Sequence, residues 1–136
     1  MPGATLIGMT STASREAAKT MISENELKRR VVHCMRDPYD VYIGRGRDPK
    51  TGKAGRWGNP FTHKPGTIAR YRVKDVDEAI SRYRSWLFQQ IKNGQISLEE
   101  LAALDDKVLG CWCAPGKCHG EILIRAARWA KLKLAE

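Results

Sequence analysis

A stripe of apolar residues at helical spacing is the feature that most restricts how this chain folds. Its members are Val76, Ile80, Tyr83, Leu87 and Ile91. They recur at intervals of three or four residues, which places side chains on one face of an α-helix. Asp75 or Asp77 can cap the start of this helix, and Asn93-Gly94 is typical of a helix end. We therefore expect a helix that packs its apolar face against another layer of structure.

Short runs of strand type lie on both sides of this helix in the sequence. Residues 30–35, 41–43 and 107–112 are apolar or β-branched and are bounded by turn residues, and residues 68–73 alternate well enough for a further short strand. Cys34 lies inside the first of these runs, so we expect it to be a small buried hydrophobic residue. Strands that alternate with helices predict an α/β fold with a small sheet.

Further helices complete the predicted domain. Ser97 with Glu100 forms a capping box that opens a short helix, and an amphipathic, basic helix begins at Cys118 or His119 and runs to the end of the chain. We interpret residues 29–136 as a single compact α/β domain with about three helices around its small sheet. Residues 1–28 have few large apolar side chains and are interpreted as an N-terminal helical extension. Within it, Ser23 with Glu26 resembles a further capping box, from which we expect a short helical turn.

The net charge favours a partner that carries phosphate. The chain has 24 Lys and Arg against 15 Asp and Glu, which gives +9, and basic domains attract polyanions because bound phosphates release counterions. A merely solvated basic surface is the alternative. No apolar run reaches the roughly 18 residues that a membrane span needs, and residues 1–9 lack the features of a secretory signal. We expect a cytoplasmic protein with reduced thiols and no membrane partner.

A long loop, residues 44–64, carries most of the candidate ligand-binding residues. Loops of this length in a compact domain are uncommon unless they are functional. The glycines of the loop allow backbone N–H groups to approach an anion, and Arg45 and Arg56 can hold phosphate. Trp57 either stacks on a base or pins the loop to the core. The glycine spacing matches neither a Walker P-loop nor a dinucleotide-binding fingerprint.

The segment 110–121 contains three of the four cysteines and supports three interpretations. In the first, Cys111, Cys113, Cys118 and His119 hold a zinc ion. In the second, Cys118 is a reactive thiolate or an anion site at a helix N-terminus, and His119 and Glu121 serve in proton transfer. In the third, the cysteines are small buried residues, His119 caps the helix and Glu121 complements the helix dipole. The spacing alone does not choose among these interpretations.

Several motifs in order resemble a bacterial and phage family classified as a domain of unknown function. The motifs are Tyr42-Ile43-Gly44-Arg45, then Trp57-Gly58-Asn59-Pro60-Phe61, an Ala79-Ile80 to Trp86-Leu87 helix, and Gly110-Cys111-Trp112-Cys113 with Cys118-His119-Gly120. The resemblance covers about residues 30–130. It implies a core site made of Gly44, Arg45, Trp57, Gly58, Asn59, Pro60, Cys111, Cys113, Cys118 and His119. It implies no established reaction, and it does not cover the N-terminal extension. The basic residues 47–53 look like an insert between the first two motifs.

Two hypotheses about function follow from these observations. In the first, the domain binds a nucleotide or nucleic acid and acts on it through the Cys/His corner: Arg45 and Arg56 hold phosphate, Trp57 stacks, and Gly44, Gly58 and Asn59 line the ligand site. In the second, it is a non-enzymatic interaction module of phage type with a structural zinc ion, which binds a protein partner.

Overall fold

Three short parallel strands form the centre of the fold. In this computed structural model residues 21–62, 71–114 and 116–136 are described. The strands β1 (Val31–His33), β5 (Leu109–Cys111) and β2 (Val41–Tyr42) lie in the order β1-β5-β2. Leu109 of the central strand is in register with both edge strands. Because β5 is buried on both faces, all of its residues are apolar or glycine. These strands confirm three of the predicted runs.

A second, smaller parallel sheet lies at the end of the long loop. It pairs β3 (Phe61–Thr62) with β4 (Tyr71–Arg72). The sequence predicted one small sheet, and in the described residues there are two. The strand predicted over 68–73 is seen only as β4, because residues 63–70 lie outside the described part of the chain. The end of the loop is thereby fixed against α3, with which β3 is in contact.

The described helices are α2 (Glu24–Arg30), α3 (Val76–Lys92), α4 (Leu98–Ala102) and α5 (Gly120–Leu134). The side chains of Ser23, Asp75 and Ser97 cap the first three, each accepting a hydrogen bond from a backbone N–H three residues later. These caps and the α/β class are as predicted. Helix α2 crosses residue 28, the predicted boundary of the N-terminal extension, and the helical turns predicted within residues 1–20 lie outside the described residues. None of these four helices is long and apolar enough to span a membrane.

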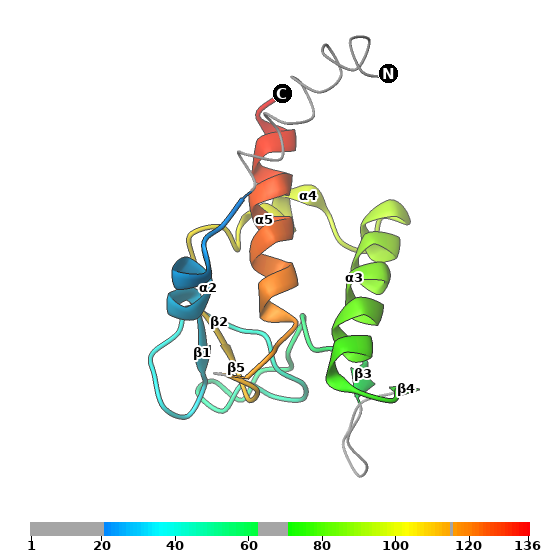
Figure 1. The fold of residues 1–136 in the computed structure, drawn as a ribbon. Helices are drawn as coiled ribbons and strands as arrows, with labels where there is room; N and C mark the ends of the chain where they lie inside the picture. Colours follow the sequence, from blue (N-terminus) through cyan, green and yellow to red (C-terminus); the bar gives the residue numbers. More distant parts are fainter. Residues whose placement is uncertain (1–20, 63–70, 115) are drawn as a thin grey trace.

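Helix α5 is the central helix of the fold. It rises from the sheet between α2 and α3 (Figure 1). Leu123, Ile124 and Ala127 of α5 are completely buried, and Trp129 makes an edge contact with Phe88 of α3, with ring centroids 6.2 Å apart. The amphipathic pattern of the last helix therefore reflects its burial against the sheet, α3 and α4. The N-terminus of this helix directly follows the cysteine-rich segment.

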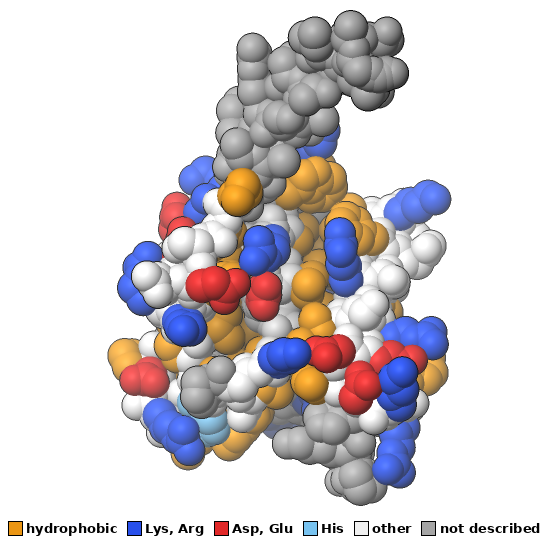
Figure 2. Space-filling view, in the orientation of Figure 1, with side chains coloured by type: hydrophobic (Ala, Val, Ile, Leu, Met, Phe, Trp, Pro, Cys, Tyr) orange, Lys and Arg blue, Asp and Glu red, His pale blue; other side chains and the backbone are white. Residues whose placement is uncertain are grey.

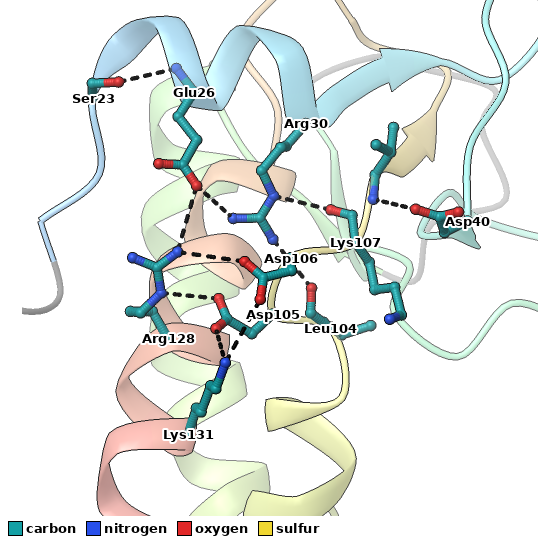
Figure 3. A network of polar contacts seen from close by, with 11 residues as sticks. Ser23, Glu26, Arg30, Asp40, Leu104, Asp105, Asp106, Lys107, Arg128 and Lys131 are labelled. Atoms are coloured by element: carbon teal, nitrogen blue, oxygen red, sulfur yellow. Dashed lines mark hydrogen bonds and ion pairs between the residues drawn. The ribbon is translucent and has the colours of Figure 1, made fainter.

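A network of charged side chains connects α2, α5 and the turn before β5 (Figure 3). Arg128 of α5 donates to the buried carboxylate of Asp105 at 3.0 Å and to Glu26 of α2 at 3.4 Å. The buried Arg30 donates to the carbonyls of Leu104 and Lys107 at 3.2 and 3.1 Å. These contacts satisfy buried polar groups and fix the approach to β5, and so the position of the cysteines that follow it.

Candidate functional site at the end of the parallel sheet

The carboxyl ends of the three parallel strands bring the predicted motifs together. β5 leads into Trp112 and Cys113, and β2 leads into Gly44 and Arg45. Since all three strands are parallel, these segments emerge at the same edge of the sheet. This is the edge at which open α/β sheets bind their ligands.

A tight turn folds the segment after β5 back onto the strand. Gly116 N–H donates to the carbonyl of Cys113 at 2.9 Å, and the returning chain places the Sγ atom of Cys118 3.1 Å from that of Cys111. Cys113 is exposed, whereas Cys111 and Cys118 are buried. The three cysteines that the sequence predicted to act together therefore form one cluster, with a single member at the surface.

Hydrogen bonds between the thiols shift their pKa values in opposite directions. Donation from Cys111 and from Cys118 lowers the pKa of Cys113. Hydrogen bonding to Cys111 and Cys113, together with burial, raises the pKa of Cys118 well above its ordinary value. We expected the helix N-terminus to lower the pKa of Cys118. The pKa of Cys118 is raised instead, because its buried sulfur is a donor to its neighbours.

The imidazole of His119 lies under this cluster. Its Nε2 atom is 2.7 Å from the carbonyl oxygen of Ile43, which can only accept, so Nε2 carries the proton. The opposite nitrogen, Nδ1, lies 3.6 Å from Cys118 Sγ, and the ring packs on Tyr83 with centroids 4.7 Å apart. His119 occupies the N-cap position of α5, but its side chain makes no capping hydrogen bond. Nδ1 is therefore the unprotonated nitrogen of the ring, and it faces Cys118 Sγ.

We expect His119 to make stability depend on pH. Burial lowers the pKa of His119 below its ordinary value of 6.5. The unfolded chain then binds a proton that the folded chain does not, so the free energy of unfolding should fall as the pH drops below 6.5, by up to about 1.4 kcal/mol per pH unit. Urea unfolding between about pH 7.5 and pH 5.5 measures this slope. His119→Gln should reduce this slope. An unchanged slope in this variant would contradict the assignment.

The geometry of the cluster differs from that of a zinc site. Zn–S bonds of about 2.3 Å in a tetrahedron imply sulfur atoms roughly 3.8 Å apart. The sulfur atoms of Cys111 and Cys118 are 3.1 Å apart, so these two do not fit around an ion as they stand. No set of three or more His, Cys, Asp or Glu side chains in the described residues is arranged to hold a metal ion. The zinc site stays a prediction, which the metal content of the purified protein tests.

Arg45, which we expected to bind phosphate, forms hydrogen bonds within its own loop. Its Nε and Nη2 atoms donate to the carbonyls of Asn59 and Phe61 at 2.6 and 2.7 Å. Two glycines allow this close packing: a Cβ on Gly44 would lie 2.5 Å from the Tyr42 hydroxyl, and one on Gly58 would lie 3.0 Å from the Arg45 backbone. Arg45 therefore holds the loop closed near Cys113, whose pKa its charge also helps to lower.

The other predicted ligand-binding residues also have partners within the protein. Arg56 pairs with Glu100, with Nε–Oε2 at 2.5 Å and Nη2–Oε1 at 2.8 Å. Trp57 is only 5% exposed, which agrees with the alternative in which it pins the loop. The buried Asn59 donates to the carbonyl of Ala79 at 3.1 Å and accepts from Phe61 N–H at 2.9 Å. Ligand binding by these residues stays a prediction, and their partners show how the loop is built.

A cavity of about 210 Å³ opens beside the cluster, between α2 and residues 114 and 116–121. Its wall includes Cys118 and two lysines, Lys28 of α2 and Lys117, together with Glu24 and Glu121. Glu121 is exposed and pairs with Arg125 at 3.2 Å. Lys28 was not predicted as a site residue, because it belonged to the predicted N-terminal extension. The capping box at Ser23 predicted a helical turn there, but no local pattern indicated that this turn would lie beside Cys118.

Comparisons with known proteins agree with the resemblance noted in the sequence. The family model described as a domain of unknown function, DUF4326, matches residues 26–129. The chain is also 31% identical over 94 residues to an uncharacterized 12.4 kDa protein encoded in the nrdA-td intergenic region of Enterobacteria phage T4. That alignment covers 69% of this chain and 72% of the phage protein. No solved structure matches the chain.

Proposed function

The chain belongs to the DUF4326 family of domains of unknown function, and we propose that it binds a nucleotide or nucleic acid beside its Cys/His cluster and acts on it there. The observation that carries this proposal is the cavity that brings Cys118 next to Lys28 and Lys117. This cavity also adjoins the N-terminus of α5, where the helix dipole favours an anion. Its small volume suits a phosphate with part of a sugar, and the rest of the ligand would lie on the surface.

The two lysines are available to such an anion. Lys28 has no ion-pair partner among the described residues. Lys117 pairs with Asp77 at 2.8 Å, and both side chains are exposed by more than 60%. Such surface pairs contribute little to stability, so a phosphate can displace Asp77 at small cost.

On the face drawn in Figure 2, the distribution of charge favours a local site over a broad polyanion surface. In Figure 2, Lys and Arg side chains are scattered over the face with Asp and Glu between them. The net charge of +9 would still raise the local concentration of anionic ligands. A nucleotide, or one part of a nucleic-acid chain, is therefore the ligand that this site suits.

The Cys/His corner would supply the chemistry. Cys118 lines the cavity, and Nδ1 of His119, 3.6 Å from its Sγ, would take the proton of this thiol. Glu121 lines the same cavity and would exchange protons with the ligand.

A paired set of lysine variants tests the binding step. We expect Lys28→Gln combined with Lys117→Gln to weaken binding of ATP or a short single-stranded oligonucleotide by roughly tenfold or more. The slope of log K against log salt concentration should also become less steep, by the amount that about two phosphate contacts contribute. Isothermal titration at several salt concentrations measures both effects. Lys53→Gln with Lys92→Gln is the matched control, because these exposed lysines do not line the cavity. Equal losses in the two double variants, or no binding by the wild type, would reject the proposal.

A further inference from the structure

The sulfur cluster has a property that ligand binding does not require. Two of its thiols, Cys111 and Cys118, are buried with their Sγ atoms 3.1 Å apart. The third, Cys113, is exposed and is hydrogen-bonded to both. Cys34 lies elsewhere, in a separate apolar cluster with Tyr39 and Tyr42. The protein thus holds one accessible sulfur in contact with two that solvent hardly reaches.

The buried pair can form a bond with little movement. A disulfide has an S–S length of about 2.05 Å, so the Sγ atoms of Cys111 and Cys118 need to approach by only about 1 Å. Cys118 lies in the loop before α5, which begins at Gly120. Closing this bond therefore requires no unwinding of that helix and no loss of pairing in β5.

We propose that Cys111, Cys113 and Cys118 form a thiol–disulfide exchange centre that reduces an organic disulfide. The thiolate of Cys113 attacks one sulfur of the disulfide, and the first thiolate leaves. Cys118 then gives up its proton and attacks Cys113 Sγ, which expels the second thiolate. Finally Cys111 attacks Cys118 Sγ, and Cys113 leaves as a thiolate again. The two leaving thiolates take up the protons of Cys111 and Cys118, so two thiols are oxidised and one disulfide is reduced.

Exposure determines this order of events. Cys113 is exposed whereas Cys111 and Cys118 are buried, so an external disulfide meets Cys113 first and the first attack belongs to Cys113. The close contact between Cys111 and Cys118 makes their bond the expected end product. This activity is independent of nucleotide binding, since it uses neither Lys28 nor Lys117.

Oxidised glutathione is a suitable probe for this reaction. The full-length protein, as purified, is treated with one equivalent, and its mass should fall by two hydrogen atoms with no glutathione retained. Peptide mapping then locates the bond, because trypsin cuts after Lys117 and chymotrypsin after Trp112, which separates all three cysteines. We expect a link between Cys111 and Cys118.

Three variants test the roles of the individual thiols. Cys113→Ser should slow the oxidation by roughly tenfold or more, since it removes the accessible nucleophile. Cys111→Ser combined with Cys118→Ser should stop the reaction at a glutathione adduct on Cys113, since no buried thiol is left to attack it. Cys34→Ser, the matched control, should react like the wild type.

Three results would overturn the proposal. The first is a stable glutathione adduct on the wild-type protein without an internal disulfide. The second is a Cys113→Ser variant that is oxidised as fast as the wild type. The third is about one equivalent of bound zinc that keeps all three thiols unreactive until a chelator removes it. Loss of nucleotide binding in the lysine variants would leave the oxidation unchanged, so the two proposals fail separately.

Discussion

Replacing Tyr83 by alanine should reduce the free energy of unfolding by about 3–5 kcal/mol, the range found when a large buried aromatic side chain is removed. Tyr83 is completely buried in α3. Its ring packs on His119 and on Trp86, with centroids 4.7 and 5.3 Å away. Its hydroxyl donates to the carbonyl of Trp57 at 2.8 Å. One side chain therefore connects α3, the long loop and the cysteine corner.

Two further variants separate the contributions of the ring and the hydroxyl. Tyr83→Phe keeps the packing but leaves the Trp57 carbonyl without this donor, so we expect a loss of about 1–2 kcal/mol. Tyr71→Ala is the matched control, because Tyr71 is half exposed and stacks on Phe61; its effect should be below about 1 kcal/mol. Urea unfolding monitored by tryptophan fluorescence measures all three. If Tyr83→Ala cost no more than Tyr71→Ala, the central position given to Tyr83 would be wrong.

Local sequence signals predicted the secondary structure well. The caps at Ser23, Asp75 and Ser97 act within three residues of themselves, so the short-range pattern contains all the information they need. The apolar run of β5 likewise identified a buried strand. The clustering of Cys111, Cys113 and Cys118 was also predictable, because few residues separate them.

The partners of the basic residues could not be predicted in the same way. Arg56 is of a residue type that often binds phosphate, but here it pairs with Glu100, which lies 44 residues away in the chain. No local pattern distinguishes a guanidinium that binds a ligand from one that holds a loop. The cavity has the same difficulty, because it joins Lys28 of α2 to the distant Cys118. The order of protonation in the cluster depends on which thiol is buried, and spacing does not specify this.

Arg45 combines a structural and an electrostatic role, and its replacement should reveal both. Its two hydrogen bonds to loop carbonyls, at 2.6 and 2.7 Å, are charge-assisted and partly buried. Losing them in Arg45→Met should cost about 2–4 kcal/mol of stability. The same variant should raise the pKa of Cys113, because the guanidinium charge helps to lower it. Urea unfolding gives the first effect, and the pH dependence of Cys113 alkylation gives the second.

Arg45→Lys distinguishes the two roles of this side chain. A lysine keeps the positive charge but lacks the planar fork that reaches both the Asn59 and the Phe61 carbonyl. This variant should therefore lose most of the stability while the pKa of Cys113 stays close to that of the wild type. Arg47→Met, which removes an exposed bond to the Gly52 carbonyl at 2.9 Å, is the matched control and should change neither quantity. If Arg45→Lys were as stable as the wild type, charge alone would hold the loop, and the guanidinium geometry would not be needed to bring this loop against the cysteine corner.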